Sequence, residues 1–121
     1  MSQTIEISPP HSLVLVLDAA GGDVPLSFAS KLVVATDSCI AIGCYTASDG
    51  PTQITFGAKS EVDQGIAPIF FAKIQVPNRK LTVKTVYADV IFSEDVASDN
   101  VTVSVWANDE KEPDVVVIGF E

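Results

Sequence analysis

The densest group of chemically active side chains in this sequence is the stretch NDEKEPD at residues 108–114. It places four carboxylates and one lysine between the apolar runs VTVSVWA and VVVIGF. A loop of this kind is typical of a metal site, of a contact surface for a basic partner, or of a solvated turn that keeps a β-rich chain in solution.

Negative charge is concentrated in the last quarter of the chain. Residues 1–88 hold 7 acidic and 6 basic side chains, a net charge of −1, whereas residues 89–121 hold 9 acidic side chains and one basic side chain, a net charge of −8. A nucleic-acid backbone would be repelled by such a surface, so direct nucleic-acid binding is not expected. Concentrated negative charge instead raises the rate and specificity of association with a basic protein.

A predicted strand at residues 100–107 divides these carboxylates into two groups. Glu94, Asp95 and Asp99 precede the strand, and Asp109, Glu110, Glu112 and Asp114 follow it. Because eight extended residues span about 25 Å, a simple meander would place the groups at opposite ends, as two acidic patches or one acidic edge.

Trp106, the single tryptophan, lies at the end of that strand beside the acidic loop. It either packs on a neighbouring strand or serves as an aromatic anchor for a basic partner. On the second interpretation, the predicted partner-binding residues are Glu94, Asp95, Asp99, Trp106, Asp109, Glu110, Glu112 and Asp114.

Metal binding and catalysis have little support in the sequence. Neither SEDVASDN nor NDEKEPD has the glycine and glutamate spacing of an EF-hand loop. His11, the only histidine, has no recognisable nucleophile motif to serve, and Gly21-Gly22 is typical of a hairpin turn. Cys39 and Cys44 would lie about 16 Å apart in one strand, which predicts two buried free thiols in a reducing compartment. We therefore expect no enzyme, no cofactor and no metal ligand.

Hydrophobic periodicity predicts a single all-β domain over residues 1–121. Valine, isoleucine, threonine and aromatic residues form short runs between turn residues, and the expected strands are 3–8, 12–19, 26–36, 38–46, 52–58, 68–76, 80–93, 100–107 and 114–120. In the 80–93 run the apolar positions change parity near Thr85, which indicates a bulge or two strands joined at a bend. The best helix candidate, residues 60–67, is stopped by Gly65. This pattern favours an antiparallel β-sandwich of eight or nine strands, with a closed barrel as the second choice.

The N-terminal stretch MSQTIEISPPHS has neither a basic region nor a cleavage site of the kind that secretory signals carry, and no apolar run reaches the roughly 18–20 residues of a membrane helix. We expect a cytoplasmic protein without membrane contact. The mean hydropathy of +0.34 is high for a single domain of this size. It predicts either a large core or apolar surface buried against a partner or a second copy.

Four segments resemble the ComJ-like competence-protein family: ITFGA (54–58), FFAKIQVPNRKLTVKTV (70–86), ADVIFSED (88–95) and NVTVSVWAN (100–108). The similarity lies in a Thr-Phe-Gly strand, a Val-Pro turn and the strands that follow it. Members of that family are small, acidic, β-rich proteins, and the founding type inhibits a DNA-entry nuclease. The stretch IGCYTASDGP departs from the family pattern, and no inhibitory residue can be carried over, so the predicted site depends on charge alone.

Together these features predict an acidic protein-binding module of the inhibitor or immunity type, which occludes a basic nuclease or toxin. Two alternatives stay open. One is a structural or assembly sandwich, of phage or surface origin, that forms a homo-oligomer. The other is a calcium-dependent ligand-binding module.

Overall fold

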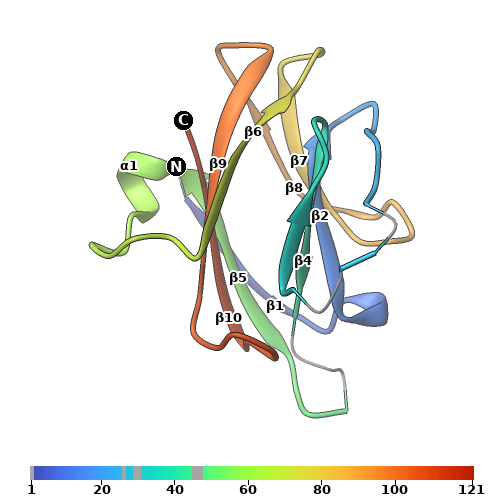
Figure 1. Ribbon diagram of the computed structural model, residues 1–121, viewed down its shortest axis with the longest axis vertical. Helices are drawn as coiled ribbons and strands as arrows, with labels where there is room; N and C mark the ends of the chain where they lie inside the picture. Colours follow the sequence, from blue (N-terminus) through green and yellow to red (C-terminus); the bar gives the residue numbers. More distant parts are fainter. Residues whose placement is uncertain (1, 26, 29–30, 45–47) are drawn as a thin grey trace.

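The computed structural model describes residues 2–25, 27–28, 31–44 and 48–121, which form two five-stranded sheets lying face to face (Figure 1). In sheet order, the first consists of β1 (Gln3–Ile7), β5 (Thr52–Ala58), β10 (Val115–Phe120), β9 (Asn100–Ala107) and β6 (Phe70–Gln75). The second consists of β3 (Val33–Ala35), β4 (Cys39–Gly43), β2 (Leu13–Asp18), β7 (Lys80–Lys84) and β8 (Val90–Asp95). Single helical turns lie at η1 (Pro10–Ser12) and α1 (Lys59–Val62). The predicted β-sandwich is confirmed; both sheets end in open edges, so the second choice, a closed barrel, is wrong.

All strand pairs are antiparallel except β5 and β10, which run parallel at the centre of the first sheet. A parallel pair needs a long connection, and here the chain between β5 and β10 supplies strands to both sheets before it returns.

The core lies between the sheets and follows the period of two that the sequence showed. Val101, Val103 and Val105 of β9 all face inward and are almost fully buried. Across the interior, the ring of Phe56 in β5 stacks on that of Phe92 in β8, with the centroids 5.5 Å apart. Aromatic contacts of this type join the two layers directly.

The parity change near Thr85 is explained by two strands rather than one. β7 ends at Lys84, the pairing of β7 with β8 slips between Val83 and Lys84, and β8 begins at Val90. Thr85 is buried in the intervening turn, where its hydroxyl accepts hydrogen bonds from the backbone N–H groups of Tyr87 and Asp89.

One strand is shorter than predicted. Of the expected strand 26–36, only Val33–Ala35 pairs in a sheet, and residues 26 and 29–30 lie outside the described part of the chain. The helix candidate at 60–67, which the sequence predicted to stop at Gly65, is a single turn, because the backbone becomes extended at Asp63 and then takes a positive φ of 75° at Gly65. Neither helix of the described residues is long and apolar enough to cross a membrane.

Both cysteines are buried and neither forms a disulfide, as the sequence predicted. Burial raises the pKa of Cys39 to about 11 and that of Cys44 to about 12. The thiols are therefore protonated at neutral pH and poor nucleophiles.

A fully buried carboxylate at the end of β2 links the second sheet to the turn between β6 and β7. Asp18, the last residue of β2, accepts hydrogen bonds from the backbone N–H of Asn78 (2.9 Å), from Asn78 Nδ2 (2.7 Å) and from the backbone N–H of Ala20 (2.9 Å). Asn78 belongs to the turn that carries the chain from β6 in one sheet to β7 in the other. Burial works to raise the pKa of Asp18, but these hydrogen bonds and the charge of Lys84 outweigh it and hold the pKa below its ordinary value.

Replacing this carboxylate should therefore destabilise the fold in a pH-dependent way. We expect Asp18→Asn to lower the free energy of unfolding by about 2 kcal/mol at pH 7, because hydrogen bonds to a buried charge are lost. A carboxylate with a lowered folded-state pKa stabilises above its unfolded pKa, and this contribution disappears as the pH falls through the folded pKa. In urea titrations the difference between wild type and variant should thus be full at neutral pH and shrink below about pH 4.

The matched control is Asp23→Asn, which removes an exposed carboxylate from the chain segment that follows β2. It should leave the stability nearly unchanged. A constant difference between Asp18→Asn and wild type from pH 7 down to pH 2 would contradict this account.

Candidate protein-binding surface

The two groups of carboxylates lie at opposite ends of the sandwich, as the meander argument predicted. β9 begins after Asp99 and ends before Asn108, and the two loops that flank it emerge at the upper and lower ends of Figure 1. We call the residues before β9 the 94–99 segment and those after it the 109–114 loop. A rigid cleft that fits one of them closely would leave the other uncovered.

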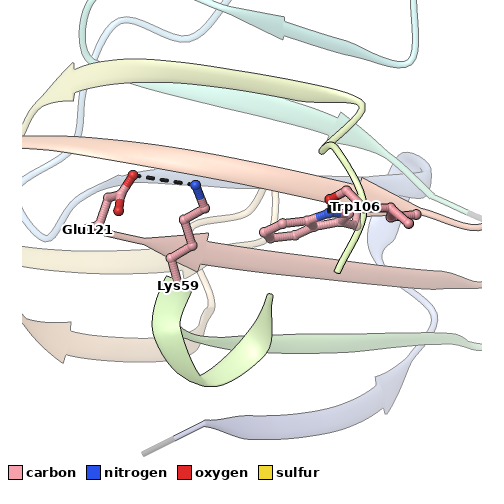
Figure 2. A network of polar contacts seen from close by, with 4 residues as sticks. Lys59, Trp106 and Glu121 are labelled. Carbon is pink, nitrogen blue, oxygen red and sulfur yellow. Dashed lines mark hydrogen bonds and ion pairs between the residues drawn. The ribbon is translucent and has the colours of Figure 1, made fainter. Parts of the chain in front are cut away.

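Basic residues lie near the 94–99 segment. Asp95 pairs with Lys80 in the β7–β8 register, and the backbone N–H of Val96 donates to the carbonyl oxygen of Arg79 at 3.0 Å. Asp95 also lines a hollow of about 430 Å³ together with Lys59, whose Nζ lies 3.6 Å from Glu121 Oε1 (Figure 2). Three basic residues thus lie near this segment, one of them paired with Glu121.

The 109–114 loop is held in shape by its own side chains. Asp109 Oδ1 accepts hydrogen bonds from the backbone N–H groups of Glu112 (3.0 Å) and Lys111 (2.8 Å), and these bonds hold its pKa below the ordinary value. Asn108 closes the loop, because its Nδ2 donates to Asp114 Oδ1 (2.6 Å) and its Oδ1 accepts from the backbone N–H of Val115 (3.2 Å). The carboxylates of Glu110 and Glu112 are thus exposed on a pre-shaped turn.

Tertiary structure adds two carboxylates that the sequence argument missed. Glu6, at the end of β1, and Asp49, in the loop before β5, line one polar hollow with Asp114. They lie far from Asp114 in the sequence. Only the pairing of β5 with both β1 and β10 brings the three chain segments together. On the other flank, Glu110 borders an apolar groove together with Lys31 and Phe70.

The described residues contain no group of three His, Cys, Asp or Glu side chains placed to hold a metal ion. His11, whose side chain is exposed, engages a phenol: its Nε2 lies 3.0 Å from Tyr87 Oη, between the β1–β2 and β7–β8 loops.

Trp106 is buried, so the structure gives it the packing role and not the anchor role. Its side chain is only 4% exposed and packs with Val62 of α1 and Val117 of β10 on the outer face of the first sheet. Its Nε1 donates a hydrogen bond of 2.9 Å to the carbonyl oxygen of Ile66. Figure 2 shows its ring lying under the chain segment that follows α1. We therefore leave Trp106 out of the contact surface.

Gly119 of β10 allows α1 to pack closely on the outer face of the first sheet. A Cβ at this position would lie 2.9 Å from Val62 Cγ2, 3.2 Å from Lys59 Cα and 3.3 Å from Trp106 Cζ3. Only glycine leaves room for α1 to lie this close to the sheet.

No model of a known protein family matches the sequence, and no protein of curated function matches it. Among solved structures, the chain is similar to ComJ from Bacillus subtilis, described as an inhibitor of the DNA-degrading activity of NucA. The TM-score is 0.61 at 14% sequence identity, and the match covers 99% of this chain and 93% of ComJ. At this identity the similarity shows a shared fold. It agrees with the resemblance seen in the four sequence segments.

The role of Gly119 can be tested through the single tryptophan. Gly119→Val should push α1 off the sheet, break the bond from Trp106 to Ile66 and cost about 1–3 kcal/mol by overpacking. We expect the fluorescence emission of Trp106 to shift to the red and acrylamide quenching to increase. Gly119→Ala should give a smaller change in the same direction. An unchanged emission maximum in the Val variant, with the fold retained by circular dichroism, would contradict the assignment.

Proposed function

We propose that this protein is a cytoplasmic, non-enzymatic inhibitor that binds a nuclease-type partner through a basic cleft of that partner. The observation that carries the proposal is the end-to-end correspondence in fold with ComJ, an inhibitor of a nuclease. The acidic end of the chain supplies an independent physical reason, since a nuclease cleft is built to attract the charges of a phosphate backbone.

The 109–114 loop is the proposed contact surface, extended by Glu6 and Asp49. Hydrogen bonds from Asn108 and to Asp109 hold the backbone of the loop in shape before any partner arrives, so less backbone entropy is lost on binding. Single-sign charge of this kind steers a basic partner and accelerates its association.

The opposite end is a poorer candidate for the main contact. Arg79, Lys80 and Lys59 lie close to the 94–99 segment, and a basic cleft would have to displace or repel these cations. We therefore assign Glu94, Asp95 and Asp99 a secondary role, which is to add to the long-range negative potential.

Two features favour binding over catalysis. The His11 imidazole is engaged by a phenol, and the two thiols are buried and protonated. An occluding inhibitor needs a complementary surface rather than reactive groups.

The experiment starts with the immobilised protein and a lysate of its own source organism, loaded at low salt and eluted with rising salt. A basic protein released as the salt screens the contact is then assayed for DNA degradation with and without the inhibitor. We expect Glu110→Lys/Glu112→Lys to weaken binding by about tenfold or more and to relieve the inhibition. Asp109 is kept in this variant because its hydrogen bonds shape the loop.

The matched control is Asp95→Lys/Asp99→Lys, which changes the net charge by the same amount at the other end of the molecule. If both double variants weaken binding equally, total charge is responsible and the proposed surface is wrong. If no basic protein is recovered, or if the recovered protein degrades DNA equally well with and without this chain, the inhibitor proposal fails.

A further inference from the structure

Strand β6 forms one edge of the first sheet, and its backbone shows which residues face outward. Thr102 of β9 exchanges two hydrogen bonds with Glu121, of 3.0 and 2.9 Å, so even-numbered residues of β9 direct their N–H and C=O groups toward β10. The odd-numbered residues of β9 therefore face β6, where Val105, Val103 and Val101 pair with Phe70, Ala72 and Ile74. Phe71 and Lys73 consequently point their backbone groups away from the sheet.

The open edge is two residues long. At its end, the backbone N–H of Gln75 already donates to the carbonyl oxygen of Asp37, at 2.8 Å. Before it, the N–H of Ile69 donates to the carbonyl oxygen of Val105, also at 2.8 Å. Among the described residues, the outward N–H and C=O groups of Phe71 and Lys73 have no backbone partner.

The side chains of the same two residues lie on the outer face of the sheet. Phe70, Ala72 and Ile74 pack toward the core, whereas Phe71 is 69% exposed and Lys73 is exposed. The neighbouring side chains of Ile66 and Ile69 are 70% and 49% exposed. Three of the seven large exposed hydrophobic side chains of the described chain thus lie within residues 66–71, which is typical of an interaction site.

We propose that β6 pairs antiparallel with β6 of a second copy, about a twofold axis through Ala72. In this register Phe71 of each copy lies opposite Lys73 of the other, and the two copies exchange four backbone hydrogen bonds, which satisfies every outward group of the open edge. Each lysine ammonium then lies beside a phenyl ring, where a cation–π contact is favourable.

A second copy is the occupant because the edge is complementary to itself. Lysine on an edge strand normally opposes pairing, but here the twofold axis places it against an aromatic ring and not against another lysine. The contact is short, so the dimer should be weak and dissociate on dilution. The inference depends on the backbone of β6 and is independent of the proposed inhibitor function.

Sedimentation velocity of the full chain, from micromolar to near-millimolar concentration, tests the proposal. We expect a monomer–dimer equilibrium at physiological salt. Phe71→Lys places two lysines opposite each other across the axis and should weaken dimerisation by about tenfold or more. Phe71→Lys/Lys73→Glu places opposite charges across the same pairs and should restore the dimer. This restoration separates a register effect from a folding defect.

A wild-type chain that stays monomeric over the whole range overturns the proposal, as does a dimer that Phe71→Lys does not weaken. A dimer that Phe71→Lys weakens and the double variant does not restore overturns the twofold register. Two results together support the β6–β6 pairing: the wild-type dimer persists at high salt, and Phe71→Lys/Lys73→Glu restores the dimer that Phe71→Lys weakens.

Discussion

The hydrogen bonds between the buried carboxylate of Asp18 and Asn78 tie the second sheet to the turn that leaves the first. β2 lies at the centre of one sheet, and the turn that contains Asn78 carries the chain from the edge of the other sheet into β7. Without a hydrogen-bond acceptor at Asp18, the backbone N–H and the side-chain amide of the exposed Asn78 would lose their bonds to a buried charge, at a cost of about 2 kcal/mol. One carboxylate therefore holds the turn between β6 and β7 against the end of β2.

The separation of charge in the molecule follows from β9. The 94–99 segment precedes this strand of eight residues and the 109–114 loop follows it, so the two groups of carboxylates lie at opposite ends of the sandwich. The turn at Arg79 and Lys80 emerges at the same end as the 94–99 segment and brings cations to it. The 109–114 loop instead meets Glu6 and Asp49, which increases the negative charge at its end of the sandwich.

The outer face of the first sheet shows a second division of roles. Over β9 and β10 it is covered by α1 and the segment after it, which bury Trp106 and Val117 against Gly119. Over β6 the cover ends, and Phe71 stands exposed beside Lys73. The outer face is therefore covered over β9 and β10 and open to association over β6. The 109–114 loop takes no part in either contact.

The sequence by itself determined the fold class, most of the strands and the position of the charge. These depend on local alternation, turn residues and composition, which are properties of neighbouring residues along the chain. It could not decide that Trp106 is buried, because a period of two tells which residues share a face and not whether a distant segment covers that face. Nor could it place Glu6 and Asp49 beside Asp114, or show that Asp109 shapes its loop while Glu110 and Glu112 remain exposed. Those facts depend on strand order and on the parallel pairing of β5 with β10, which bring together residues far apart in the chain and which only tertiary packing sets.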